Sequence, residues 1–209
     1  MSLNIREILK ELSKTRPLFQ NETDLQFFIA LALKEKGYEI RLEYYSGKEN
    51  NKRKYVDLVV VKNNECYIFE FKYKTKKEEI IISNEKFELF DQQAIDLGSY
   101  LVLKDVERTE KHMNQKFLNV EVTKGYVIFL TNDKNYKKGF KENSLCYNYA
   151  LTDNKIFIKN QPLEFIIPSN KTKEETCVKN LKEIKFKNTY QIKWETYSNY
   201  LDMLIFEIK

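Results

Sequence analysis

Three charged residues of this 209-residue chain have types and spacing that suit a divalent cation: Asp57, Glu70 and Lys72. Asp57 lies within a valine-rich segment, where an ionised carboxylate needs a partner. If Asn63 and Asn64 form the turn between two antiparallel strands, Asp57 faces Glu70, with Lys72 diagonally placed on the same face. Two facing carboxylates repel each other, and a bound cation relieves that repulsion. Oxygen ligands favour Mg²⁺ or Mn²⁺ over zinc.

The alternative is a structural salt bridge between Glu70 and Lys72. The chain has 36 Lys and Arg residues and 31 Asp and Glu residues, so an acid two positions before a lysine is expected several times by chance. The acid Asp57 on the facing strand favours the metal-site interpretation over the salt bridge.

The chain has few of the residues that zinc sites, histidine relays and nucleotide-binding loops require. His112 is the single histidine, and the three cysteines, Cys66, Cys146 and Cys177, are far apart, so zinc sites and histidine relays are disfavoured. The five glycines form no phosphate-binding or dinucleotide-binding motif. Carboxylates, lysines, amides and a bound cation therefore remain for any chemistry.

Length and composition indicate one folded domain spanning residues 1–209. The net charge of +5 permits nucleic-acid binding without requiring it. No apolar run approaches the roughly 20 residues of a membrane helix, so no membrane association is expected. Residues 1–10 lack the apolar segment of a signal peptide, which predicts a cytoplasmic protein.

Two helices should precede the strands. Apolar residues at helical spacing predict a helix over residues 5–12 that ends at Arg16, before Pro17. A second helix should begin at the N-cap Asn21, with Glu22 in its first turn, and end near Gly37.

Alternating patterns then predict strands over residues 39–45, 55–61 and 66–73, with a basic loop over residues 46–54. A further hairpin about Ser83 and Asn84, a helix over residues 91–112 bent at Gly98, and a strand over residues 126–130 follow. Short apolar runs at residues 156–158, 163–167 and 204–208 predict extra strands whose place in space stays open. The core would span about residues 6–133, with a strand-rich elaboration over about 141–209.

The charged residues and their neighbours resemble the PD-(D/E)XK nuclease superfamily, and in particular an uncharacterised prokaryotic branch of it. Val56 stands where the superfamily name has proline, at a position that varies widely. The resemblance is carried by Arg16-Pro17-Leu18-Phe19, Asn21-Glu22, Asp24, Gln26, Asp57, Glu70-Phe71-Lys72-Tyr73-Lys74-Thr75, Gln92, Ala94, Asp96-Leu97-Gly98, Tyr100 and Lys104-Asp105-Val106.

The resemblance implies an α/β, restriction-endonuclease-like fold with a central mixed β-sheet flanked by helices. It also implies that Asp57, Glu70 and the Phe71 carbonyl bind Mg²⁺ or Mn²⁺, and that Lys72 orients or deprotonates the attacking water. Glu22 would complete the site. Glu22 has an equal alternative as a first-turn acid that complements the helix dipole.

A glutamine would reach the site from the helix after the third strand. Gln92 is preferred for this role over its competitor Gln93, although spacing alone does not decide between them.

Basic stretches on either side of the predicted site are candidates for holding a phosphate backbone. They are Lys48, Lys52, Arg53, Lys54, Lys74, Lys76 and Lys77. Ordinary solvated loops are the alternative for each of them.

The function implied is a Mg²⁺-dependent nuclease, with DNA favoured over RNA as substrate. A homodimer would let two sites cut both strands. The competing hypotheses are a non-catalytic nucleic-acid-binding or protein-interaction module with the same fold, and a scaffold whose acids and lysine form a salt-bridge network.

Overall fold

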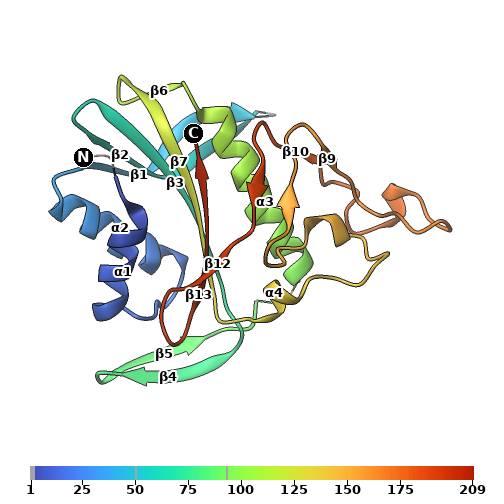
Figure 1. Cartoon of the computed structure of the whole chain (residues 1–209), viewed down its shortest axis with the longest axis horizontal. Coiled ribbons are helices and arrows are strands. Elements are labelled where there is room, and N and C mark those ends of the chain that lie inside the picture. The colour runs from blue at the N-terminus through green and yellow to red at the C-terminus, as the bar shows by residue number, and fades with distance from the viewer. Residues whose placement is uncertain (1–2, 50, 93) are drawn as a thin grey trace.

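The computed structural model describes residues 3–49, 51–92 and 94–209, and is built around a large mixed β-sheet with helices on both faces (Figure 1). Strands follow the order β1-β2-β3-β7-β13-β12, and β6 pairs with β7 beside this path. The β3–β7 pair is parallel and the other pairs are antiparallel. The prediction of an α/β protein with a mixed sheet flanked by helices is confirmed. The strands are β1 (Glu39–Glu49), β2 (Lys52–Lys62), β3 (Glu65–Lys74), β6 (Lys116–Phe117), β7 (Val120–Thr131), β12 (Trp194–Thr196) and β13 (Asp202–Ile208).

Helices α1 (Ile5–Thr15) and α2 (Glu22–Glu35) cover one face of the sheet. The Asn21 side chain accepts the N–H of Asp24 at 2.9 Å, as its predicted N-cap role requires. The C-cap of α1 is Arg16, directly before Pro17, so the predicted helix end is also confirmed. The apolar residues of both helices pack against alternate β3 side chains, namely Phe69, Phe71 and Tyr73.

Helix α3 (Ile95–His112) lies on the opposite face. Its buried residues Val102 and Val106 pack with Val127 and Phe129 of β7. Because side chains alternate along a strand, Glu70 faces α3, away from the aromatic residues of β3. This agrees with the prediction that Glu70 and Lys72 lie on the face opposite to Phe69 and Phe71.

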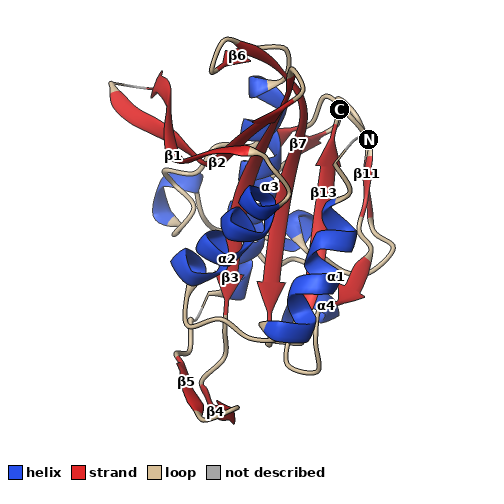
Figure 2. Cartoon of the chain, turned by 90° about the vertical axis from the view of Figure 1, so that its left-hand side faces the viewer, coloured by secondary structure: helices blue, strands red, loops and turns tan. Residues whose placement is uncertain are grey.

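Two hairpins have the predicted turns. Asn63 and Asn64 both have positive φ, and five facing pairs of β2 and β3, from Leu58↔Phe69 to Lys62↔Glu65, follow the predicted register. Strands β4 (Glu78–Ile82) and β5 (Glu85–Leu89) turn at Ser83 and Asn84. Figure 2 shows this second hairpin extending away from the end of the sheet.

Three predicted boundaries were wrong, and one of them is the strand predicted over residues 126–130, which is β7 and begins at Val120. The segment 46–54 is mostly strand instead of loop: β1 continues to Glu49 and β2 begins at Lys52, with a bulge between Tyr45 and Gly47 that allows the pairing to continue. Helix α3 begins at Ile95 instead of residue 91, because Ala94 has a left-handed backbone, with φ of 71°. The helix then continues through Gly98.

The C-terminal apolar runs do not share one location. Residues 204–208 form part of β13, which pairs with β7 in the main sheet. Only the first one or two residues of the earlier runs are strand, in small two-stranded sheets beside α3. Near them the buried Glu110 carboxylate accepts the backbone N–H groups of Lys187 and Asn188 at 2.7 and 2.9 Å. These small sheets contain β8 (Ile156–Phe157), β9 (Pro162–Leu163), β10 (Ile184–Lys185) and β11 (Tyr190–Gln191), and the remaining short helices are α4 (Asn135–Lys138), η1 (Tyr147–Tyr149) and η2 (Lys173–Glu175).

No helix within the described ranges is both long enough and apolar enough to cross a membrane.

Close packing of α3 on β7 requires glycine at position 125. A Cβ there would lie 2.2 Å from Thr109 Cγ2 and 3.4 Å from Ile68 Cγ1. Thr109 is fully buried and β-branched, so it cannot easily move away. We predict that Gly125→Ala lowers the free energy of unfolding by about 1–3 kcal/mol, measured by urea denaturation.

The variant Thr109→Ser removes the obstructing methyl group and provides the control. Gly125→Ala should cost less in the Thr109→Ser background than in the wild type. An equal cost in both backgrounds would contradict this explanation.

Candidate functional site

The structure brings four of the predicted site residues together on and around the α3 face of β3. Glu70 and Lys72 come from β3, Asp57 from β2 and Glu22 from the start of α2. Two α3 residues, Asp105 and Arg108, join them through ion pairs. We call these residues the charged cluster: Glu22, Asp57, Glu70, Lys72, Asp105 and Arg108.

Asp57 contacts β3 through the backbone. The β2–β3 pairing stops at Leu58↔Phe69, and Asp57 Oδ2 accepts the N–H of Phe71 at 2.7 Å. Burial raises the pKa of Asp57, and the Phe71 N–H and the Lys72 charge only partly oppose the rise. Asp57 therefore lies beside β3, but the predicted pairing of Asp57 directly opposite Glu70 is not formed, because the carboxylate binds the Phe71 N–H instead.

Glu70 is the most deeply buried member, with no solvent exposure. Arg108 binds it with two donors: Nε lies 3.1 Å from Oε1, and one terminal nitrogen contacts Oε2. The same terminal nitrogen lies 3.1 Å from Asp105 Oδ1. Burial nevertheless holds the pKa of Glu70 well above its ordinary value.

Lys72 is surrounded by oxygen atoms. Its Nζ lies 2.8 Å from Asp105 Oδ2, 2.9 Å from the Phe71 carbonyl oxygen and 3.9 Å from Glu22 Oε1. Burial lowers the pKa of Lys72, but the Asp105 and Glu22 carboxylates outweigh it and the net shift is upward. Lys72 is therefore an ammonium group at neutral pH.

Glu22 reaches β3 from the first position of α2. Its Oε2 accepts the N–H of Tyr73 at 2.9 Å, and burial raises its pKa against the opposing effect of Lys72. Glu22 is therefore a first-turn acid of α2, and its side chain also belongs to the charged cluster. Its predicted part in a metal site stays a prediction.

Sequence reasoning missed Asp105 and Arg108 as members of the site. Their spacing of three residues puts both on one side of α3, next to the buried Val102 and Val106. Charged residues at helical spacing beside a buried stripe were the available signal.

A further acid, Glu43, was also missed. It interrupts the β1–β2 pairing opposite Asp57 and has a left-handed backbone, with φ of 47°. The residue is exposed, but partial desolvation and the charge of Asp57 raise its pKa. A non-glycine residue in this conformation stores backbone strain, which is often found at functional sites.

Gln92 is not brought into the cluster. It lies in the segment before α3, its side chain is exposed, and its backbone N–H donates to the Thr75 carbonyl at 2.9 Å. The prediction that it reaches in from a helix was wrong about the helix, because the left-handed Ala94 delays the helix start. Its competitor Gln93 lies outside the described residues.

The predicted basic residues divide into two groups. Lys48, Lys52, Arg53 and Lys54 lie on the arm formed by β1 and β2. The others lie at or just after the C-terminal end of β3 and are Lys74, Lys76 and Lys77.

The donor set of the cluster suits a hard cation, although the side chains are arranged around protein cations. Across residues 3–49, 51–92 and 94–209, no three His, Cys, Asp or Glu side chains are placed so as to hold a metal ion. Instead the Arg108 guanidinium binds the Glu70 carboxylate, and the Lys72 ammonium donates to the Phe71 carbonyl oxygen. However, four carboxylates face two cations, and three of the acids have raised pKa values. Carboxylate and carbonyl oxygens are of the chemical type that Mg²⁺ or Mn²⁺ binds, but in the described residues they are not arranged as a ligand set.

Comparisons of the chain with protein-family models, with curated proteins and with solved structures gave no match.

The Arg108–Glu70 ion pair should dominate local stability. We predict that Arg108→Met lowers the free energy of unfolding by about 3–5 kcal/mol at pH 7.5, because a buried carboxylate loses its partner. The loss should shrink as pH falls, since Glu70 already has a raised pKa and binds a proton more readily in the folded than in the unfolded chain. Urea denaturation at pH 5.5 and 7.5 measures both effects.

Two variants serve as controls. Glu70→Gln combined with Arg108→Met removes the unpaired charge and should recover part of the loss. Arg41→Met, which breaks the exposed pair with Glu39, should cost about 0–1 kcal/mol. A pH-independent cost for Arg108→Met would refute the role given to Glu70.

Proposed function

We propose that the chain is a metal-dependent nuclease with a restriction-endonuclease-like fold of the PD-(D/E)XK type, acting on DNA in preference to RNA. The observation that carries the proposal is the charged cluster itself. Acids on two adjacent strands and on α2 gather around one lysine, with more carboxylates than cations in a buried setting. Such groupings are costly and are commonly found at functional sites.

The residues that would hold the cation are Asp57, Glu70 and the Phe71 carbonyl. When bound, a divalent cation lowers the pKa of a coordinated water and offsets negative charge that develops on a phosphodiester. The Arg108 guanidinium would have to release Glu70, at least in part, for the cation to bind there.

Lys72 and Glu22 supply the other parts of the chemistry. The raised pKa of Lys72 suits an ammonium that orients the attacking water and stabilises charge on the phosphoryl oxygens, and it disfavours a role as proton acceptor. Glu22 suits that role better, because its side chain is 36 % exposed and its raised pKa moves it towards neutral pH.

A second candidate function is a non-catalytic nucleic-acid-binding module. The bidentate Arg108–Glu70 pair favours it, because a protein cation already occupies the site proposed for metal. The two functions differ in whether a divalent cation displaces Arg108.

The first test is cleavage of supercoiled, linear and single-stranded DNA and of RNA, with Mg²⁺, Mn²⁺ or EDTA. We expect cleavage only with metal, and a loss of at least about 10²-fold in Asp57→Asn and in Lys72→Met.

The exposed Lys134→Met and Asp91→Asn are the matched controls for that assay and should cut like the wild type. Cleavage that persists in EDTA, or folded Asp57→Asn protein that cuts normally, would rule out the proposed mechanism. Folding is checked by circular dichroism.

Metal binding should be linked to proton release. Acids with raised pKa values hold protons in the folded chain above about pH 4, where unfolded carboxyls lose them, so they favour folding less as pH rises. A cation competes with those protons. We therefore expect 10 mM Mg²⁺ to raise the melting temperature more at pH 8 than at pH 6, measured by calorimetry.

Asp57→Asn and Glu70→Gln should both lose this Mg²⁺ effect, whereas Asp91→Asn should keep it. An absence of any Mg²⁺ effect at either pH would favour the non-catalytic module.

A further inference from the structure

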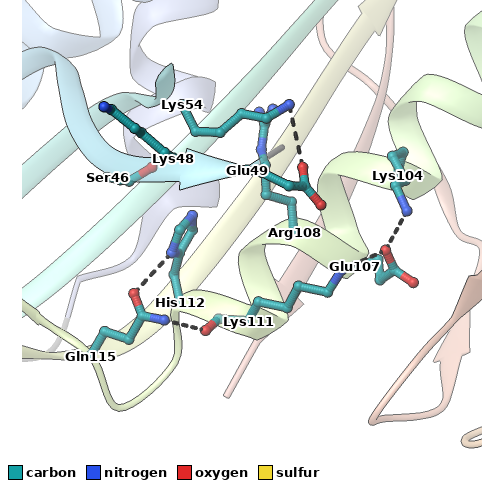
Figure 3. A pocket seen from close by; sticks show the side chains of 11 residues that line it. Ser46, Lys48, Glu49, Lys54, Lys104, Glu107, Arg108, Lys111, His112 and Gln115 are labelled. Atoms are coloured by element: carbon teal, nitrogen blue, oxygen red, sulfur yellow. Dashed lines mark hydrogen bonds and ion pairs between the residues drawn. The ribbon is translucent and has the colours of Figure 1, made fainter. Parts of the chain in front are cut away.

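A pocket of about 310 Å³ lies between the β1–β2 arm and α3. Figure 3 shows its wall residues: Lys48 and Lys54 from the arm, and Lys104, Arg108, Lys111 and His112 from α3. The volume is at the small end of the range for ligand sites, which suits one small unit and not a duplex.

The pocket wall is positively charged. Its lining includes four lysines and only two glutamates, Glu49 and Glu107. Glu49 pairs with Lys54 at 3.4 Å, and Glu107 pairs with Lys104 at 2.5 Å and Lys111 at 3.0 Å. These lysine partners lower the pKa of both glutamates, so both glutamates stay ionised and each is neutralised by a neighbouring lysine. The remaining positive charge of the wall is available to a ligand.

His112 presents an unused ring nitrogen at this pocket. The side chain is 9 % exposed, and within the described part of the chain Nε2 is buried and has no hydrogen-bond partner. Gln115 Nε2 donates to the Lys111 carbonyl at 2.8 Å, which turns Gln115 Oε1 towards His112 Nδ1 at 3.1 Å. An amide oxygen can only accept, so Nδ1 carries the proton and, in the neutral ring, Nε2 has a free lone pair.

The neutral state has a physical cause. Burial lowers the pKa of His112, and the nearby charges of Arg108 and Lys111 lower it further, while the Gln115 hydrogen bond opposes them. The Phe117 ring packs on the imidazole, with the two ring centroids 5.4 Å apart. The facing wall of the pocket carries Lys48, Glu49 and Lys54. An anion in the pocket would reverse the effect of these cations on the ring.

We propose that this pocket binds a phosphate monoester, such as the terminal phosphate of a nucleotide, and that His112 Nε2 contacts it. On binding, the ring takes up one proton at Nε2 from the buffered solution, and the new N–H donates to a phosphate oxygen. The lysines supply the remaining charge, as cationic side chains commonly do for phosphates.

Arg108 connects this pocket to the charged cluster, since it lines the pocket and binds Glu70. The phosphate could belong to a free nucleotide or to the end of a strand. Assigning it to a strand end rests on the proposed nuclease function, whereas phosphate binding itself does not.

The experiment uses the single histidine as its own probe. Tag-free, ¹⁵N-labelled protein in EDTA at pH 7 is titrated with adenosine 5′-monophosphate or inorganic phosphate, and the imidazole nitrogens are followed by NMR. We expect saturable movement of the Nε2 signal from the range of an unprotonated to that of a protonated nitrogen. Sodium chloride at equal ionic strength should not cause it. An Nε2 signal that does not respond to millimolar ligand would overturn the proposal.

Paired lysine variants test the pocket wall. Lys48→Gln combined with Lys111→Gln should weaken binding of the monophosphate at least about 10-fold. Lys134→Gln combined with Lys138→Gln removes the same charge from exposed positions outside the pocket and should change it less than 2-fold. Equal weakening by both pairs would indicate non-specific attraction and refute a site.

Oligonucleotides then distinguish the two sources of phosphate. In EDTA, fluorescence anisotropy compares single strands with a 5′-phosphate, a 3′-phosphate or hydroxyl ends. Tighter binding of one phosphorylated strand, lost in the Lys48→Gln and Lys111→Gln variant, supports a strand end. Equal binding of all strands, with the NMR response intact, supports a free nucleotide. Because no cleavage is involved, failure of the nuclease proposal would leave these results unchanged.

Discussion

The structure depends on one electrostatic constraint: a glutamate without solvent exposure on a central strand must find compensation inside the protein. Glu70 lies on β3 beside its pairing with β7, and its side chain is fully buried under α3, so water cannot compensate its charge. Arg108 of α3 provides two donors, and Asp105 then balances Arg108 and Lys72. The buried Glu70 thus accounts for one ion pair that connects α3 to β3, and the pair of Asp105 with Lys72 is the second.

The same constraint relates the two faces of the protein. Glu22 starts α2 on the other face, and its carboxylate binds the N–H of Tyr73 while it lies within 3.9 Å of Lys72. Asp57 binds the N–H of Phe71, two residues earlier on the same strand. Side chains from β2 and α2 therefore both contact the β3 backbone, and the geometry of the cluster is set by rigid elements rather than by loops. Precise placement of this kind is what a chemical site requires.

Local interactions made part of this predictable from sequence. The Asn63–Asn64 turn fixed the register that places Asp57 beside β3, and Asn21 fixed the start of α2 with Glu22 in its first turn. Long-range packing decided the remainder. The contact of α3 with Glu70 spans 38 residues, and no local pattern reports which helix residue will meet a given strand residue. The pairing of β13 with β7 is similarly distant. The prediction for Gln92 was wrong because the left-handed backbone of Ala94 delays the start of α3. Helix propensity does not reveal such a backbone conformation.

If both the metal site and the phosphate site exist, two groups compete for Arg108: the Glu70 carboxylate and a phosphate in the basic pocket. Arg108 compensates Glu70 in the cation-free chain, and it also lines the basic pocket. A phosphate in that pocket attracts the guanidinium, which weakens its hold on Glu70 and leaves that carboxylate more available to a cation. A cation on Glu70 likewise releases Arg108 towards the phosphate. By thermodynamic linkage each ligand must strengthen the other by the same factor. A residue that stabilises the resting protein would then also couple the two sites, and the protein would avoid an uncompensated buried charge in either state.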